Sequence, residues 1–297
     1  MPDDISLSLK AQLALQKAGF DYTRSLGQNF LFDEELLEKI AALGGADEGV
    51  NVLEIGPGAG LLTAVMAKRK ANVLAVEVDR SLESVLGSVL SDMRNVKIVF
   101  ADALKTDLGA LVRETFASDG YVICANLPYY ITADFLIKAV TAEPLARSIT
   151  LMLQKEAAQR VLSKPGEEGW CTLSALVSFY CEGETLLDVP RSAFTPVPHV
   201  DSALIRLTPK CERVVPDALS RRFTGFIKSA FAMRRKTLQN NISSSYNIPK
   251  ERIAQALTLT GKDPKTRGEA LTLEELGRVF LTLKEIYEQT DGKEGKT

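Results

Sequence analysis

The turn Asn126-Leu127-Pro128-Tyr129 combines two hydrogen-bond acceptors, a rigid proline and an aromatic ring. The exocyclic amino group of adenine is a poor nucleophile because its lone pair is delocalised into the ring. Acceptors placed around that nitrogen, the Asn126 side-chain oxygen and the Leu127 carbonyl, would draw it towards a tetrahedral form. Pro128 would fix the turn without adding a hydrogen-bond donor. Tyr129 would stack on the base, and such stacking stabilises the bound base by about 1–3 kcal/mol. A structural turn with a core tyrosine is the alternative.

A glycine-rich segment, Gly56-Pro57-Gly58-Ala59-Gly60, lies between a β-branched run and a helical stripe. Glycines let a backbone approach a ligand closely, and the start of a helix presents free amide donors. The Gly-x-Gly-x-Gly spacing differs from the Gly-x-Gly-x-x-Gly of dinucleotide folds. A tight strand-to-helix turn of purely structural use would look similar, so this segment alone leaves both interpretations open.

Acidic residues end the next two predicted strands. Glu77 lies 21 residues beyond Gly56, where a carboxylate can accept ribose hydroxyls. Asp102 follows the third strand and would suit an adenine amino group, whereas Asp79 is better explained as a helix cap. Carboxyl ends of parallel strands meet at one edge of a sheet. The pattern therefore predicts a nucleoside cleft at that edge.

A mostly parallel sheet is needed to bring these residues together. Between Asp33 and Gln154, short β-branched runs alternate with helical stripes, which predicts βαβ units. The predicted strands cover residues 51–55, 72–77, 95–101, 121–125 and 148–153.

Side-chain caps and prolines mark further boundaries. Asp33, Asp79 and Thr132 are predicted N-caps because each precedes a helical apolar stripe. Residues 171–181 and 200–208 are predicted as two more strands at one edge of the sheet, separated by a proline-rich loop.

The β pattern ends after Pro209, and helical periodicity predicts a second, all-α domain over residues 210–297. Thr272 and Glu275 form a capping box that opens its last helix. The charge balance is −8 over residues 1–209 and +6 over residues 210–297. Such a split favours an anionic partner for the C-terminal domain, with a solvated basic face as the alternative.

Cations are concentrated between residues 221 and 236, a segment without any acid. Interleaved phenylalanines are predicted to form its buried face, which leaves the cations free to meet phosphate. The predicted RNA-binding residues are Arg221, Arg222, Lys228, Arg234, Arg235 and Lys236.

Composition limits the remaining possibilities. The 297 residues are 45% hydrophobic and 25% charged, which is typical of a globular protein of two domains and excludes disorder, collagen and coiled coil. No apolar run approaches the roughly 18 residues of a membrane span, and the acidic start at Met1 is unlike a signal peptide, so we expect a cytoplasmic protein. The scattered cysteines predict free thiols, and the single histidine, His199, argues against a metal site.

The sequence resembles the rRNA adenine-N6,N6-dimethyltransferases, in particular their bacterial small-subunit (16S) branch, over nearly the whole chain. The shared motifs are Leu26-Gly27-Gln28-Asn29-Phe30-Leu31, Leu53-Glu54-Ile55-Gly56-Pro57-Gly58-Ala59-Gly60, Asn126-Leu127-Pro128-Tyr129-Tyr130-Ile131-Thr132, Gln154-Lys155-Glu156, Phe194-Thr195-Pro196-Val197-Pro198-His199-Val200-Asp201-Ser202 and Arg234-Arg235-Lys236-Thr237-Leu238. One departure is Glu168-Gly169-Trp170-Cys171, where the family usually has Lys-x-Tyr-Gly.

The resemblance implies an α/β fold, with a Rossmann-like class I methyltransferase sheet flanked by helices on both faces and a small C-terminal all-α domain. Residues 1–209 would then bind S-adenosylmethionine and residues 210–297 would bind RNA. It implies catalytic roles for the Asn126–Tyr129 turn and makes Phe194 a second wall of the adenine pocket, although Phe194 could equally be plain core. The cofactor-binding residues implied are Asn29, Leu31, Gly56, Glu77, Asp102 and Asn126.

The implied substrate is a pair of adjacent adenines in the hairpin loop near the 3′ end of small-subunit rRNA. Each adenine would be methylated twice by a monomer acting on a 30S pre-ribosomal particle, with a role in small-subunit biogenesis. Three alternatives remain: a 23S rRNA dimethylase of macrolide resistance, a DNA adenine methyltransferase, and a non-catalytic RNA-binding assembly factor.

Overall fold

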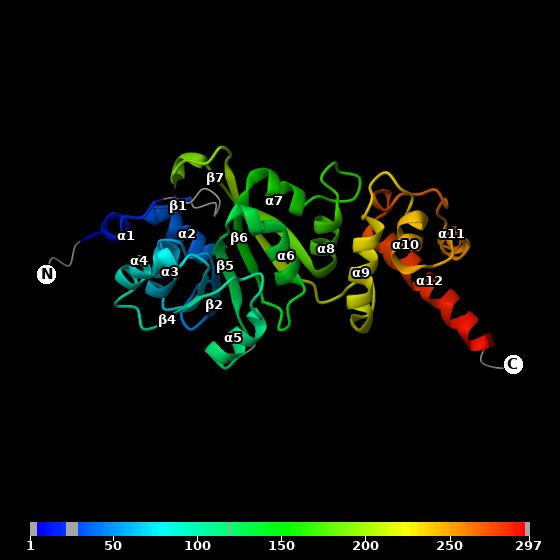
Figure 1. The fold of residues 1–297 in the computed structure, drawn as a ribbon, viewed down its shortest axis with the longest axis horizontal. Coiled ribbons are helices and arrows are strands. Elements are labelled where there is room, and N and C mark those ends of the chain that lie inside the picture. Colours follow the sequence, from blue (N-terminus) through cyan, green and yellow to red (C-terminus); the bar gives the residue numbers. More distant parts are fainter. Residues whose placement is uncertain (1–4, 22–28, 119, 295–297) are drawn as a thin grey trace. The chain divides into compact units, whose positions relative to one another are not determined.

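A computed structural model of the protein describes residues 5–21, 29–118 and 120–294 (Figure 1). The strands in these ranges are β1 (Phe30–Leu31), β2 (Asn51–Ile55), β3 (Asn72–Glu77), β4 (Val96–Phe100), β5 (Val122–Asn126), β6 (Ile149–Gln154), β7 (Cys181–Val189), β8 (Phe194–Thr195) and β9 (Ser202–Pro209). The helices are α1 (Leu7–Lys17), α2 (Glu34–Leu43), α3 (Leu61–Lys68), α4 (Glu83–Val89), α5 (Leu108–Phe116), α6 (Thr132–Val140), α7 (Lys155–Val161), α8 (Thr172–Tyr180), α9 (Ser220–Ala230), α10 (Leu238–Tyr246), α11 (Lys250–Leu259) and α12 (Leu273–Glu294). Short 3-10 turns are η2 (Arg80–Leu82), η3 (Tyr129–Ile131), η4 (Arg191–Ala193), η5 (Asp217–Leu219) and η6 (Gly268–Ala270).

The large sheet has the strand order β4-β3-β2-β5-β6-β9-β7. Strands β4, β3, β2, β5 and β6 run parallel to one another, and β9 is antiparallel to β6. A separate antiparallel pair, β1 and β8, aligns Leu31 with Phe194. The mixed sheet and its connecting helices form the predicted α/β architecture.

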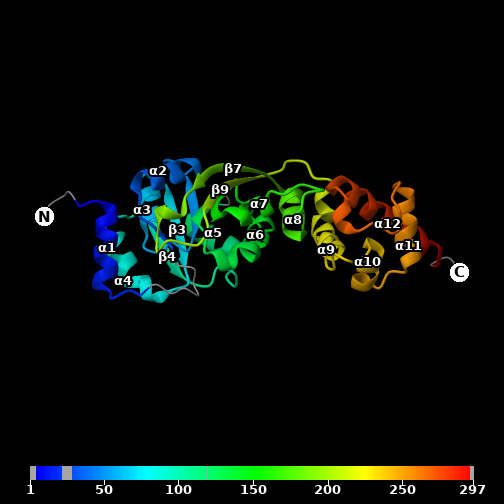
Figure 2. The same cartoon turned by 90° about the horizontal axis from the view of Figure 1, so that it is seen from above.

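The direction of chain crossovers reverses between β2 and β5. From β2 the chain moves outward through β3 to β4, and it then returns to β5 and continues to β6. Because such crossovers are right-handed, α3 and α4 lie on one face of the sheet, and α5 and α6 lie on the other (Figures 1 and 2). Ligands of open α/β sheets bind at such a reversal, outside the carboxyl ends of the strands.

The predicted parallel strands are confirmed to within one residue at each end. Asp33 caps α2 by accepting a hydrogen bond from the Leu36 amide at 3.0 Å, and Asp79 accepts one from the Ser81 amide at the start of η2. The predicted cap at Thr132 is wrong. Thr132 is the first residue of α6, and Ile131 occupies the cap position without a side-chain hydrogen bond, because η3 leads directly into the helix.

The strand predicted over residues 171–181 is also wrong, since residues 172–180 form α8. The Ser174 hydroxyl accepts a hydrogen bond from the Cys171 amide at 2.8 Å, and this bond fixes the start of the helix. Most of the helix is buried, so its sequence lacks a polar stripe and resembles a buried strand. The edge strand β7 begins at Cys181 instead, and it covers residues that the sequence assigned to the loop. The strand predicted over residues 200–208 corresponds to β9, which lies with β7 at one edge of the sheet.

The chain divides into two compact units. Residues 1–158 and 182–209 form the first unit, and residues 159–181 and 210–297 form the second. The segment that contains α8 therefore groups with the C-terminal helices, whereas the domain boundary predicted at residue 209 assigned it to the sheet. In the second unit, α9 packs against α8, α10 and α12.

Aromatic side chains form the core of the second unit. Phe223 of α9 contacts Phe179 of α8 and Phe280 of α12, with ring centroids 4.9 and 5.3 Å apart. The predicted capping box is confirmed at the start of α12: Thr272 and Glu275 each accept a hydrogen bond from the other's amide. Within the described ranges, no helix combines the length and apolarity needed to cross a bilayer.

Candidate functional site

The glycine-rich loop after β2 forms the floor of a cleft at the crossover reversal. Gly56, Gly58 and Gly60 all have positive φ angles, of 68°, 57° and 80°, which side chains other than glycine rarely adopt. A Cβ at Gly56 would lie 3.1 Å from the Pro128 ring, and one at Gly58 would lie 2.8 Å from Phe30. The loop backbone therefore approaches both neighbouring segments too closely for side chains.

Glu77 at the end of β3 ties this loop to the next strand. Its carboxylate accepts hydrogen bonds from the backbone amides of Gly58, Val78 and Asp79, at 3.1, 2.8 and 2.9 Å. Burial raises the pKa of Glu77 despite these bonds. A carboxylate accepts about four hydrogen bonds, so Glu77 retains acceptor capacity towards a ligand in the cleft, which it lines.

Asp102 lies beyond the end of the neighbouring strand β4 and is not among the described residues that line the cleft. The amide of Leu104 donates to it at 2.9 Å, and Lys105 approaches it at 3.2 Å. The hydrogen bond from the Leu104 amide, followed by the hydrogen bond from the Lys105 side chain, lowers the pKa of Asp102. Asp102 therefore stands ionised at the predicted edge of the sheet.

The Asn126 side chain has a defined orientation. Its amide nitrogen donates to the Asn29 carbonyl oxygen at 3.3 Å. A carbonyl can only accept, so the nitrogen must face Asn29, and the side-chain oxygen is left for another donor. The Leu127 amide donates a hydrogen bond to the Met152 carbonyl oxygen at 3.3 Å, but the Leu127 carbonyl oxygen accepts no hydrogen bond from any described residue. Two acceptors at this turn are thus available.

Tyr129 is anchored at its far end. Its hydroxyl lies 3.1 Å from the hydroxyl of Ser202, the buried first residue of β9. Burial raises the pKa of Tyr129, so the phenol stays protonated. The bond fixes the ring at the cleft, which Tyr129 lines together with Asn126, Leu127 and Pro128.

The structure does not bring Phe194 to this cleft. Phe194 is 1% exposed, pairs with Leu31 through the β1–β8 ladder and is not among the described lining residues. Asn29 and Leu31 do line the cleft. Leu26, Gly27 and Gln28 of the predicted motif lie outside the described residues.

Two lining residues with ionisable side chains, Glu54 and Tyr130, have no role in the site predicted from sequence. Glu54 is buried beneath the glycine loop and accepts a hydrogen bond from the Thr63 hydroxyl at 2.5 Å. Burial raises the pKa of Glu54 to about 8. Tyr130 is 52% exposed, and its pKa is raised by burial and by the nearby charges of Asp102 and Glu77. In the sequence, the position of Glu54 just before the glycine-rich segment is the feature that could have placed it at the cleft.

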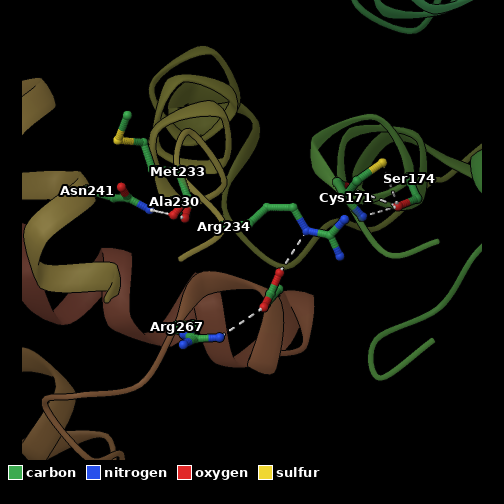
Figure 3. A network of polar contacts seen from close by, with 8 residues as sticks. Cys171, Ser174, Ala230, Met233, Arg234, Asn241 and Arg267 are labelled. Atoms are coloured by element: carbon green, nitrogen blue, oxygen red, sulfur yellow. Dashed lines mark hydrogen bonds and ion pairs between the residues drawn. The ribbon is translucent and has the colours of Figure 1, made fainter. Parts of the chain in front are cut away.

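The predicted RNA-binding cations all lie in the second unit. All six side chains are exposed, on α9 or on the loop of residues 231–237 that follows it. Arg234 forms an ion pair with Glu269 at 3.1 Å, and Glu269 also lies 3.8 Å from Arg267 (Figure 3). The other five make no ion pair with any described residue.

A buried asparagine holds the 231–237 loop. The Asn241 side chain, 3% exposed, donates to the carbonyl oxygens of Ala230 and Met233, at 3.0 and 3.2 Å (Figure 3). The Leu238 amide donates to Thr266 at 2.8 Å, and a Cβ at Gly268 would overlap the Ala230 carbonyl. The backbone that carries Arg234, Arg235 and Lys236 is therefore fixed from both ends.

Comparison with solved structures identifies the fold. The 23S rRNA methyltransferase ErmE aligns over 86% of this chain and 100% of its own, with a TM-score of 0.63 and 28% identity. A dimethyladenosine transferase from Plasmodium falciparum aligns over 86% and 98%, with a TM-score of 0.66 and 24% identity. The fold is that of a class I methyltransferase.

Residues 19–285 match the family model for ribosomal RNA adenine dimethylase, and the chain belongs to that family. A relative from Bacillus licheniformis named ribosomal RNA small subunit methyltransferase A is 40% identical over 96% of this chain and 99% of its own length. The protein of the same name from Geobacillus thermodenitrificans is 40% identical over 97% and 99%.

Proposed function

We propose that this chain dimethylates N6 of two adjacent adenines in the 3′-terminal hairpin loop of small-subunit rRNA, using S-adenosylmethionine. The observation that carries the proposal is the Asn126–Tyr129 turn, which meets the glycine loop at the crossover reversal and offers two available acceptors beside an anchored aromatic ring. Relatives named small subunit methyltransferase A are 40% identical, against 28% for the 23S enzyme ErmE. This difference supports the small-subunit RNA as substrate.

The cleft has suitable groups for S-adenosylmethionine. The glycine loop allows close backbone approach, and Glu77 has acceptor capacity for ribose hydroxyls. In this proposal the cofactor is held by Asn29, Leu31, Gly56, Glu77, Asp102 and Asn126.

S-adenosylmethionine supplies a methyl group on a sulfonium, which is activated for direct transfer and needs no covalent nucleophile. The Asn126 side-chain oxygen and the Leu127 carbonyl oxygen accept hydrogen bonds from the two N6 hydrogens. These bonds favour a tetrahedral nitrogen, whose lone pair is no longer delocalised into the ring. Tyr129 stacks on the extruded base and fixes its position. The proton leaves late to solvent, so no side chain acts as a strong base.

The second methylation places a further demand on the same turn. N6-methyladenine has one amino hydrogen, so only one of the two acceptors is then occupied. The pocket must rotate the amino group so that this hydrogen meets an acceptor and the new methyl group finds space. We propose Phe194 as the opposite wall, which would require the β1–β8 ladder to shift.

The C-terminal helices bind the RNA in this proposal. The six cations from Arg221 to Lys236 would contact phosphates, and each contact releases counterions from the nucleic acid. We further propose that the chain acts as a monomer on a 30S pre-ribosomal particle.

Methyl transfer to four substrates tests the proposal: small subunits lacking these methyl groups, naked small-subunit rRNA, 23S rRNA and DNA. Mass spectrometry of nuclease digests would measure N6,N6-dimethyladenosine. We expect it in the small-subunit samples, at two adjacent positions near the 3′ end. Product confined to 23S rRNA or DNA would assign a different substrate. Absence from every sample, with RNA binding retained, would favour a non-catalytic assembly factor.

A further inference from the structure

The second unit contains an open groove that the methyl-transfer site does not use. It encloses about 550 Å³ and is formed by α9, α10, α12 and the residue Ile248. Its lining includes the aromatic side chains of Phe226, Tyr246, Phe280 and Tyr287. Small-ligand pockets enclose about 300–1,000 Å³, so the groove has room for a flat ring system.

The floor of the groove is apolar and aromatic. Phe226 and Phe280 pack together with ring centroids 5.4 Å apart, and Ile242 and Leu283 are buried beside them. Tyr246, in contrast, is 45% exposed. An exposed tyrosine that lines the same groove as these phenylalanines offers a ring on which a planar group can stack.

A glycine in the middle of α9 shapes one wall. A Cβ at Gly225 would lie 2.9 Å from the Tyr246 hydroxyl. Glycine inside a helix costs about 1 kcal/mol relative to alanine. Its presence in α9 is explained by the close approach of Tyr246, which the glycine allows.

The rim of the groove is positively charged. Arg221 and Arg222 are exposed and form no ion pair with any described residue. Lys284, on the opposite side, is neutralised by Glu288 at 2.7 Å. The groove therefore presents two uncompensated guanidinium groups next to aromatic rings, which favours a ligand with a planar apolar part and an adjacent anion.

We propose that this groove binds an unpaired nucleotide of the RNA substrate, with its base stacked on Tyr246 and its phosphate on Arg221 and Arg222. Aromatic faces combined with guanidinium groups are the usual means of holding a single-stranded base. An acidic amphipathic peptide is the competing ligand, but its apolar side chains would not require the flat face of Tyr246. The proposal rests on the proposed action on rRNA and adds a second RNA contact outside the methyl-transfer cleft.

Two uncharged changes test the groove. Tyr246→Ala removes the stacking ring, and Gly225→Leu fills its wall. Because stacking on one side chain is worth about 1–3 kcal/mol per base, we expect each variant to weaken binding to naked small-subunit rRNA about fivefold to a hundredfold. The control is Ser244→Ala, which changes an exposed residue of α10, the helix that carries Tyr246, outside the groove and should change the affinity less than threefold.

Circular dichroism and thermal melting would verify that the variants fold. Ultraviolet crosslinking of the wild-type complex, followed by peptide mass spectrometry, should identify Tyr246 or Tyr287. In methyl-transfer assays of the groove variants, we expect KM for rRNA to rise while kcat is unchanged. If the wild-type protein transferred no methyl group, the proposed function would be overturned, but the groove proposal would still be tested by RNA binding. The groove proposal is overturned if both groove variants bind naked rRNA with an affinity within twofold of wild type. It is also overturned if the variants lose only binding to a ribosomal protein in assembled particles.

Discussion

The cleft at the sheet edge and the cationic surface of the helical unit are built in opposite ways. In the cleft, the Glu77 carboxylate accepts hydrogen bonds from three backbone amides, and the Asn126 side chain is oriented by a hydrogen bond to a backbone carbonyl. The main chain therefore fixes these polar groups. On the helical unit, the six predicted RNA-binding cations are exposed at the ends of long side chains. Among the residues that the structure describes, only Arg234 of these six has an ion-pair partner. Transfer of a methyl group requires a few atoms to be aligned accurately, whereas binding to RNA phosphates requires many charges whose positions can vary. Single changes should therefore abolish the function of the cleft but reduce RNA binding gradually.

The largest effect is expected for Glu77→Ala. The amides of Gly58, Val78 and Asp79 lose their acceptor, and the cleft loses the carboxylate proposed to accept the ribose hydroxyls. A hydrogen bond to a charged group is worth about 1.5–3 kcal/mol. We predict that affinity for S-adenosylmethionine falls at least about a hundredfold, as measured by titration calorimetry. Glu77→Gln, which keeps one acceptor oxygen, should lose less. Equal affinities in wild type and Glu77→Ala would remove Glu77 from the cofactor site.

A pH-dependent effect should follow from Glu54. Burial raises its pKa from 4.5 to about 8, so between these values the folded protein binds more protons than the unfolded chain. Stability is therefore highest below this range and falls as the pH rises towards 8. At roughly 1.4 kcal/mol per pH unit, we predict a loss of a few kcal/mol between pH 5 and 8. In Glu54→Gln this loss should be smaller, and what remains comes from Glu77, whose pKa burial also raises. Urea unfolding at several pH values would measure it. Parallel pH profiles of the two proteins would contradict the assignment.

The loop of residues 231–237 is the part of the helical unit that should behave like the cleft. Asn241→Leu removes both hydrogen bonds to the Ala230 and Met233 carbonyls, and we predict a loss of about 2 kcal/mol in the free energy of unfolding. RNA affinity should fall severalfold at a temperature where the variant is folded. The control is Asn240→Leu, which should be close to neutral. Unchanged RNA binding in folded Asn241→Leu would show that the loop needs no fixed backbone.

The smallest and most gradual effect is expected for the cations of this loop. Replacing Arg234, Arg235 and Lys236 with glutamine should reduce the slope of log affinity against log salt by about 2, since each phosphate contact contributes somewhat less than 1. Arg234 should contribute least because Glu269 already pairs with it. The control is Lys262→Gln, which removes a cation already paired with Glu275. A slope that stays the same in the triple variant would assign these cations to solvent.

The sheet edge could be predicted from sequence because its information is local. Gly56, Glu77 and Asn126 each end or follow a parallel strand, and the topology of such a sheet brings strand ends together whatever the details of packing. The positions of these residues followed from strand prediction alone.

Features that depend on long-range contacts could not be predicted. The burial of Phe194 depends on pairing between β1 and β8, which are far apart in the chain. Helix α8 is buried on most sides, so hydrophobic periodicity could not distinguish it from a strand. The hydrogen bonds of Asn241 depend on how α10 packs against the end of α9.

The most direct test of the account is single-turnover methyl transfer by Asn126→Ala, with cofactor affinity measured in parallel. If the Asn126 oxygen polarises the adenine amino group, the transfer rate should fall about 10²–10³-fold, as for loss of other transition-state hydrogen bonds, while S-adenosylmethionine binds within about tenfold of wild type. Asn126→Asp retains an acceptor but loses the donor to Asn29, and should keep part of the rate. A transfer rate in Asn126→Ala close to that of wild type would contradict the account.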